Sequence, residues 1–207
     1  MVYGAAMEVK VCGLTSLDDA RAAVDAGADY LGFVFYENSP RAVTARSVIE
    51  ILAELGDVRA LGVFVNESPQ VVVDTVKECG LYAAQIHGDE DANDFRGLEV
   101  PVWRALWIED GVAFPEPDIW QSERYVVDAA APGQYGGSGV LADWGIAAEL
   151  AGRVPVMLAG GLTADNVAAA VTAVRPLGVD VSSGVERTPG VKDHEAVRAF
   201  VAAVKSA

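Results

Sequence analysis

Short apolar runs alternate with longer amphipathic stretches along the chain, and this alternation restricts the possible folds more than any other feature of the sequence. The runs are rich in Val, Ala, Leu and Phe and are apolar on both faces, which is typical of parallel strands covered by helices. We predict eight strands, at residues 9–12, 30–35, 60–65, 83–87, 100–105, 125–128, 154–159 and 179–182.

The stretches between these runs carry the residues that start and stop helices. Ser16 precedes one stretch and Gly27 follows it, while Ser68-Pro69 and Gly80 enclose another. Ser is a preferred N-cap, Pro is favoured at the first helical position, and Gly ends helices. We predict helices at residues 17–26, 47–55, 69–79, 89–95, 144–151, 164–174 and 194–205. The connection over residues 107–123 contains two prolines and predicts no clear helix.

Eight such strand–helix units predict an α/β fold, a single-domain (β/α)8 TIM barrel over residues 1–207. Residues 1–7 are expected to be an N-terminal extension, with either Met1 or Met7 as the native start. The alternative is an open, doubly wound sheet. That fold usually has a G-x-G-x-x-G turn after its first strand, and Cys12-Gly13-Leu14-Thr15 lacks it. We therefore favour the barrel.

The acidic charge balance excludes one class of partner and suggests an environment. Thirty acidic residues face fifteen basic ones, a net charge of −15. Nucleic acid needs a basic face, so we expect none as a partner. The excess of acids favours a halophile with a salty cytoplasm, where salt screens self-repulsion. We expect no membrane partner, since every apolar run is short. Two cysteines fit a reducing, cytoplasmic location. The sequence does not indicate the oligomeric state.

Polar residues gather where the predicted strands end, which is where barrels of this type carry their chemistry. Cys12 ends the first strand, and Lys10 points to the same side of it. A cation close to a thiol favours the thiolate, the form that acts as a base. The ordinary interpretation of a free cysteine is a small buried apolar residue. Asp128 ends the sixth strand.

Two glycine-rich turns indicate a phosphate site. Gly160-Gly161 follows the seventh strand, and Ser183-Gly184 follows the eighth. Such turns leave backbone N–H groups free for an anion, and phosphate sites in these barrels often follow strands seven and eight. A third stretch, residues 133–139, is expected to be a mobile loop that closes over the mouth. Each turn taken alone is equally typical of an ordinary connection.

Several specific motifs stand in order along the chain. They are Lys10-Val-Cys-Gly-Leu-Thr15, Gly32-Phe-Val-Phe35 with Ser39-Pro-Arg41, Gly62-Val-Phe-Val-Asn66, Gln85-Ile-His-Gly-Asp-Glu90, Gly136-Gly-Ser-Gly139 with Asp143-Trp144, Leu158-Ala-Gly-Gly-Leu162 and Val179-Asp-Val-Ser-Ser-Gly-Val-Glu186 with Pro189-Gly190 and Lys192-Asp193. Together they closely resemble the phosphoribosylanthranilate isomerase family of tryptophan biosynthesis. The resemblance runs from about Glu8 to the C-terminus. It implies an Amadori rearrangement of N-(5-phosphoribosyl)anthranilate.

The resemblance also implies roles for individual residues. Cys12 would be the general base and Asp128 the general acid. Arg41 would bind the anthranilate carboxylate, since a guanidinium matches that group as a fork. His87 and Asp180 would line the site, or serve only the barrel structure. The phosphate would be held by Gly160, Gly161, Ser183 and Gly184. No cofactor and no metal are expected, because the chain has two His and no clustered metal ligands.

Two other functions compete with this interpretation. One is another phosphosugar barrel enzyme, such as indole-glycerol-phosphate synthase or the histidine-pathway aldose–ketose isomerase. The synthase needs Lys and Glu inside the barrel, where Lys10 is the only strand Lys, and the histidine-pathway enzyme is expected to have Asp in place of Cys12. The other is a phosphate-binding barrel without catalysis, which would tolerate replacement of Cys12.

Overall fold

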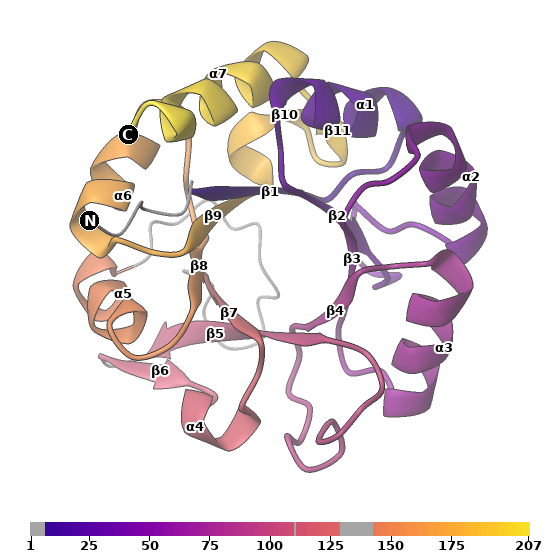
Figure 1. The fold of residues 1–207 in the computed structure, drawn as a ribbon, viewed down its shortest axis with the longest axis horizontal. Helices are drawn as coiled ribbons and strands as arrows, with labels where there is room; N and C mark the ends of the chain where they lie inside the picture. Colours follow the sequence, from indigo (N-terminus) through magenta and orange to yellow (C-terminus); the bar gives the residue numbers. More distant parts are fainter. Residues whose placement is uncertain (1–6, 110, 129–142) are drawn as a thin grey trace.

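The parallel strands of the chain form a closed barrel with helices around it (Figure 1). The computed structural model describes residues 7–109, 111–128 and 143–207. In the barrel, neighbouring strands follow the order β1-β2-β3-β4-β5-β7-β8-β9, and β9 pairs with β1 to close it. The predicted (β/α)8 fold is confirmed.

The strands agree with the prediction in number and position, apart from a few residues at their ends. Their bounds are β1 Glu8–Cys12, β2 Tyr30–Val34, β3 Ala60–Phe64, β4 Ala83–Ile86, β5 Val102–Glu109, β7 Arg124–Asp128, β8 Val156–Leu158 and β9 Gly178–Val181. Three short strands are additional to the barrel set. These are β6 Val112–Phe114, which is antiparallel to β5, and the hairpin β10 Glu186–Thr188 and β11 Val191–Lys192.

The helices begin and end where capping residues allow. Their bounds are α1 Leu17–Ala26, α2 Ala45–Leu55, α3 Pro69–Cys79, α4 Pro117–Trp120, α5 Trp144–Ala151, α6 Val167–Val174 and α7 His194–Lys205, with a 3₁₀ turn η1 at Ser183–Val185. Ser16 caps α1, and Gly27 ends it in the left-handed conformation. Ser68 caps α3, with Pro at its start. These caps are the ones that the sequence predicts.

Three predicted elements differ from the structure. The helix expected at 47–55 starts earlier, because Thr44 and Ser47 form a capping box. The helix expected at 164–174 starts at Val167, because Asn166 binds the turn before it through Thr163 N–H and the Gly161 carbonyl. The helix expected at 89–95 is absent from the described residues, where that stretch forms turns. The connection over 107–123 holds β6 and the one-turn α4.

Alternation along the strands divides the core into two layers. Every second side chain points into the barrel, and apolar ones among them pack into one cluster, made of Tyr30, Leu61, Ala83, Trp103, Val126, Met157 and Ala159. The other side chains pack against the surrounding helices in a larger second cluster. Apolar side chains thus fill much of the barrel interior.

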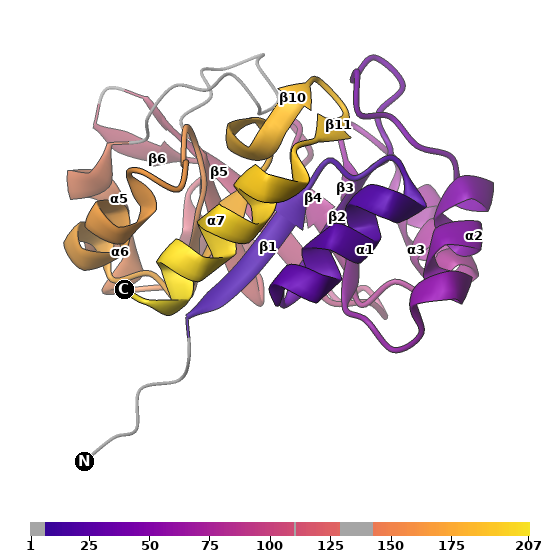
Figure 2. The ribbon, with the colours of Figure 1, turned by 90° about the horizontal axis from the view of Figure 1, so that it is seen from above.

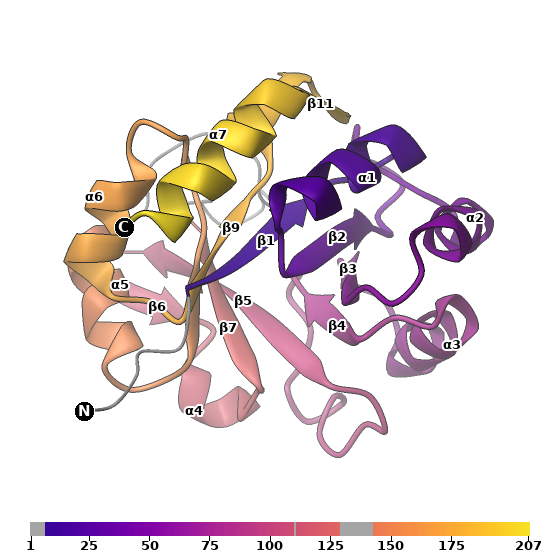
Figure 3. The same ribbon diagram turned by 45° about the horizontal axis from the view of Figure 1, so that its top comes forward.

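The β10–β11 hairpin lies at the upper end of the barrel, on the side of β1 and α7, as the side view shows (Figure 2). In a tilted view β1 lies between β2 and β9, so residues from both ends of the chain meet there (Figure 3). Within the described part of the chain, no helix is long and apolar enough to cross a lipid bilayer.

Candidate active site

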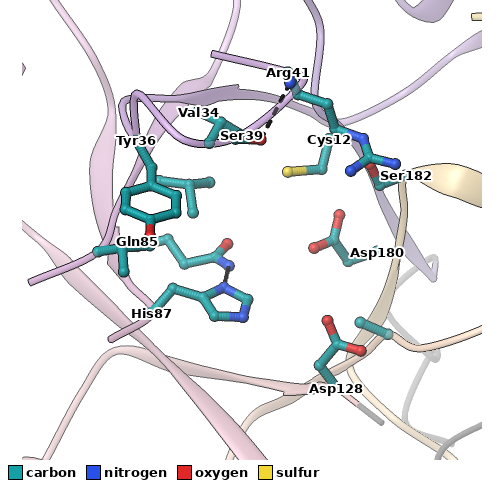
Figure 4. A pocket seen from close by; sticks show the side chains of 13 residues that line it. Cys12, Val34, Tyr36, Ser39, Arg41, Gln85, His87, Asp128, Asp180 and Ser182 are labelled. Atoms are coloured by element: carbon teal, nitrogen blue, oxygen red, sulfur yellow. Dashed lines mark hydrogen bonds between the residues drawn. The ribbon is translucent and has the colours of Figure 1, made fainter. Parts of the chain in front are cut away.

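A pocket opens at the carboxyl ends of the barrel strands, the end at which barrels of this type carry their sites. Its polar side chains come from separate strands and loops and point toward a common centre (Figure 4). The pocket brings together five residues that the sequence predicts for the site, namely Cys12, Arg41, His87, Asp128 and Asp180.

Cys12 lies at the end of β1 with its thiol directed into the pocket (Figure 4). Gly32 on the neighbouring strand makes room for it, because a Cβ at Gly32 would lie 2.7 Å from the Cys12 sulfur. Lys10 Nζ is fully buried below and donates to Asp180 Oδ2 at 2.8 Å. Burial raises the pKa of the Cys12 thiol, and the positive charge of Lys10 opposes that rise.

The predicted neighbourhood of Lys10 and Cys12 is therefore real, but Lys10 does not make Cys12 an acidic thiol. Burial also disfavours the Lys10 ammonium, yet the charges of Asp180 and Cys12 outweigh this effect and raise the pKa of Lys10. Lys10 therefore stays charged inside the barrel. Asp180 and Cys12 share the single positive charge of Lys10, and the Cys12 thiol remains harder to ionise than an exposed thiol.

Asp128 and Asp180 face the thiol from other parts of the barrel wall. Asp128 ends β7 and lies across the pocket from Cys12, with Asp180 on β9 between them (Figure 4). Both carboxyl groups are largely buried. Asp180 gives one oxygen to Lys10, and its Oδ1 is buried without a hydrogen-bond partner in the described part of the protein. The pocket thus offers a thiol on one side and a carboxyl group on the other.

His87 follows β4 and points into the pocket beside Gln85, whose side-chain amide contacts His87 Nδ1 at 3.1 Å. Burial, together with the nearby charges of Arg104 and Lys10, lowers the pKa of His87 to about 3. The imidazole is therefore neutral near pH 7. It can hydrogen-bond to a ligand there, but it cannot serve as a cation.

The loop that carries His87 is tied down from two neighbouring strands. Arg104 on β5 is 1% exposed and donates to the carbonyls of Ile86 and Gly88 and, at 3.0 Å, to Glu90. Asn66, after β3, accepts the Asp89 N–H and donates its own N–H to Glu90. These contacts use the polar groups of residues 88–90 and explain why no helix starts there.

Arg41 lies in the loop between β2 and α2, at the rim of the pocket beside Cys12 and Ser182 (Figure 4). Its guanidinium makes two hydrogen bonds to Glu186 on β10, 2.8 Å from Nε to Oε1 and 2.7 Å from Nη2 to Oε2. Its backbone N–H donates to the Ser39 hydroxyl. The hydrogen bonds to Glu186 raise the pKa of Arg41, so the charge is permanent.

The two predicted phosphate turns lie against each other beside the pocket. A Cβ at Gly184 would collide with the carbonyl oxygen of Leu162, so only glycine allows this approach. Gly160 and Gly161 both have positive φ. In the described part of the chain, the N–H groups of Gly160, Gly161, Ser183 and Gly184 donate to no backbone carbonyl. These four residues adjoin the pocket without lining it.

Sequence reasoning missed three residues that shape the site, which are Gln85, Glu186 and Lys192. Gln85 stands two residues before His87, so strand alternation could have placed both on one face. Glu186 and Lys192 give no such signal, because Glu186 binds Arg41 across 145 residues and Lys192 binds Glu186. The expected mobile loop at 133–139 lies outside the described residues. Among the described residues, no three His, Cys, Asp or Glu side chains cluster as metal ligands would.

Comparison with known proteins identifies the family. The family described as N-(5′-phosphoribosyl)anthranilate isomerase matches residues 9–203. A curated member from Myxococcus xanthus is 51% identical, covering 97% of each chain, and one from Pelobacter propionicus is 44% identical, covering 96% of each. The chain belongs to this family.

Solved structures of phosphoribosylanthranilate isomerases have the same fold. The enzyme from Thermus thermophilus superposes with a TM-score of 0.87 at 35% identity, covering 97% of this chain and 99% of that one. A second isomerase was solved in complex with reduced 1-(o-carboxyphenylamino)-1-deoxyribulose 5-phosphate. It gives a TM-score of 0.82 at 34% identity, covering 97% of this chain and all of that one. This chain is therefore an isomerase of the same family and architecture.

Proposed function

We propose that this chain catalyses the Amadori rearrangement of N-(5-phosphoribosyl)anthranilate to 1-(2-carboxyphenylamino)-1-deoxyribulose 5-phosphate, with Cys12 as general base and Asp128 as general acid. The observation that carries the proposal is the position of a thiol and a carboxyl group on opposite sides of one pocket in a member of this family (Figure 4). The solved relative that holds a reduced form of this product supports the same ligand class.

The first step is ring opening. Asp128 donates its proton to the furanose ring oxygen, the bond between C1 and that oxygen breaks, and the nitrogen lone pair forms the C1=N bond of an iminium.

The second step is removal of the C2 proton. The Cys12 thiolate accepts this proton, the C–H electron pair forms a C1=C2 bond, and the iminium pair returns to nitrogen as an enolamine. Protonation at C1 and loss of the 2-hydroxyl proton then give the ketose, so the reaction consumes no other reagent. Lys10 supports this step, because its charge favours the thiolate.

Two binding groups would hold the ends of the substrate. Arg41 would pair with the anthranilate carboxylate, and Gly160, Gly161, Ser183 and Gly184 would offer N–H groups to the phosphate. His87 and Asp180 would hydrogen-bond to the sugar between these groups. We place this reaction in tryptophan biosynthesis on the basis of the family, and in the cytoplasm, which agrees with two free cysteines.

The test follows the loss of anthranilate-type fluorescence from substrate generated in place, for wild type, Cys12→Ala and Asp128→Asn in high salt. We expect wild-type turnover and a slowing of roughly a hundredfold or more in each variant, as for the loss of a general base or acid. Cys79→Ala is the matched control, because Cys79 is the other buried free cysteine and lies on α3 outside the pocket. Full activity of Cys12→Ala would contradict the assignment of the base.

A further inference from the structure

Glu186 holds two buried cations at once at the rim of the pocket. Both of its oxygens accept from Arg41, and Oε1 also accepts from Lys192 Nζ at 2.8 Å. The Glu186 side chain is 4% exposed, that of Lys192 is fully buried and that of Arg41 is 12% exposed. We call these three residues the Glu186 clamp. They come from the β2–α2 loop and the β10–β11 hairpin, two segments that are distant in sequence.

The backbone around the clamp is shaped to admit the Arg41 side chain. A Cβ at Gly13 would lie 2.5 Å from Arg41 Cδ, and one at Gly190 would lie 2.8 Å from the carbonyl oxygen of Pro40. Gly190 N–H also donates to Glu186 Oε1 at 3.3 Å. The hairpin and the β2–α2 loop therefore meet backbone to backbone, which leaves the Arg41 side chain a single narrow path.

The clamp leaves one edge of the Arg41 guanidinium for a ligand. Glu186 occupies the Nε–Nη2 edge, and Nη1 donates to no group in the described part of the protein. Arg41 lines the pocket, whereas Glu186 and Lys192 do not. Two cations and one anion give the clamp a net charge of +1. A free guanidinium edge in a positively charged cluster fits an anion with two coplanar oxygens, which is a carboxylate.

Stability alone gives a weak reason for such a cluster. Burying three charges carries a large desolvation cost, and apolar residues of similar size are often equally stabilising. A fixed guanidinium has a different use, because a long side chain held in one rotamer loses little further freedom when it binds a ligand. The clamp is therefore better explained by recognition than by folding.

We propose that Glu186, with Lys192 as its counter-charge, is a positioning residue that fixes Arg41 for the carboxylate of the substrate and so makes the site selective for carboxylate-bearing aryl amines. The inference rests on the proposed function, because it takes Arg41 as the carboxylate partner. Glu186 itself touches no reacting atom. Its effect reaches the substrate through Arg41.

The experiment compares two substrates that differ only in the carboxylate. Ribose 5-phosphate is combined with anthranilate or with aniline to give the two N-phosphoribosyl amines, and the rearranged products are quantified by chromatography. The test variant is Glu186→Gln/Lys192→Met, which removes one negative and one positive charge and keeps the net charge of the clamp at +1. Lys192 also favours ionisation of Cys12, which both substrates require, so a loss confined to the carboxylated substrate reports the position of Arg41.

We expect kcat/KM for the carboxylated substrate to fall by about 10- to 100-fold, the range for losing a well-placed charged hydrogen bond. Most of this fall should be an increase in KM. With the aniline substrate the change should stay within about twofold, because no carboxylate is present to be misplaced. Arg41→Met should lose the preference for the carboxylated substrate. Equal losses on both substrates, or no loss on either, would overturn the inference.

Two further variants guard the result. Arg46→Met/Glu50→Gln also removes one positive and one negative charge, here from an exposed ion pair on α2. It should leave kcat/KM unchanged for both substrates. Glu186→Asp keeps the charge and shortens the side chain by one carbon, so it should show the same substrate-dependent loss even if the double variant folds poorly. Absence of wild-type turnover would contradict the proposed function itself, whereas turnover without the substrate-dependent loss would contradict only the role of Glu186.

Discussion

Cys12 and Lys10 form a pair in which charge and burial oppose each other. Burial raises the pKa of the thiol, and Lys10 is the nearest group that restrains the rise. Because the thiolate is the basic form, kcat/KM should increase with pH until the thiol of the free enzyme is ionised. The reaction should therefore be faster in mildly alkaline solution than at neutral pH.

Lys10→Met tests this relation. Without the ammonium, only the weaker effect of Lys192 opposes burial and the charge of Asp180 at the thiol, so the rising limb of kcat/KM should move to higher pH. The measurement is a pH–rate profile of the variant beside Lys77→Met, which removes an exposed lysine of α3. An unmoved limb in Lys10→Met would show that Lys10 does not tune the base.

His87 gives a prediction about stability in acid. Its pKa is about 3 in the folded protein and near its ordinary value of 6.5 after unfolding. Between these values the unfolded chain takes up a proton that the folded chain refuses, so stability is lost as pH falls below about 6.5. The loss should be no more than about 1.4 kcal/mol per pH unit. Urea unfolding of wild type and His87→Gln at pH 7 and 5 measures it, and parallel losses would refute it.

Some residues of the candidate site can be predicted from the sequence and others cannot, because only some of them follow from a local pattern. Cys12 and Asp128 end strands, and strand ends are visible in the pattern of apolar runs. Glu186 and Lys192 act through Arg41, whose position depends on how a distant hairpin packs. Partner choice of this kind is a property of the folded chain, so no local pattern contains it.

Among the elements, the loop after β4 shows best how tertiary contacts override local preference. Residues 89–95 have a helical pattern, yet Asp91 accepts the N–H of Asn93 in a local turn and Asn66 accepts that of Asp89. These bonds compete with helix formation. By contrast, α1 and α3 were predicted correctly because their capping residues are adjacent in sequence.

Arg104 should be the residue on which this loop depends most. Replacing it with Met leaves the Glu90 carboxylate, 4% exposed, without its cation, and leaves two carbonyls without their donor. We expect Arg104→Met to lower the free energy of unfolding by about 3–5 kcal/mol, the usual cost of breaking a buried pair. Urea unfolding measures this loss. Arg187→Met, which removes an exposed pair, is the control.

A variant that also lacks the Glu90 charge tests whether Arg104 and Glu90 act as a pair. Arg104→Met/Glu90→Gln removes both charges, so it should be less destabilised than Arg104→Met alone. If the double variant loses the sum of the two single losses, the two side chains do not act as a pair.

The whole molecule carries a strong excess of negative charge, which local structure does not explain. With thirty acidic and only fifteen basic residues, repulsion between the acids exceeds their attraction to the bases. Most of the acids lie on the exposed sides of the helices and loops. We predict that the melting temperature rises by several degrees between low and multimolar KCl, where the Debye length falls to about 3 Å. An unchanged melting temperature would contradict adaptation to a salty cell.

A charge-reduced variant separates screening from general salt effects. Asp57→Asn/Glu67→Gln/Glu78→Gln removes three exposed charges that make no ion pair in the described residues. Its melting temperature should respond less to KCl than that of wild type. The barrel itself was predictable because it follows from a repeated pattern, whereas the fold does not determine the net charge.

The closure of the barrel between β1 and β9 has a consequence for the order of events during synthesis. Lys10 and Asp180 are 170 residues apart, and Arg41 and Glu186 are 145 apart. During synthesis, Cys12 therefore leaves the ribosome early, and Asp180 and Glu186, which complete the site around it, leave late. The nascent chain contains Cys12 and Arg41 long before their partners are made, and contacts between residues so far apart in sequence form slowly. This enzyme should gain its activity in one late step, when its last strand arrives.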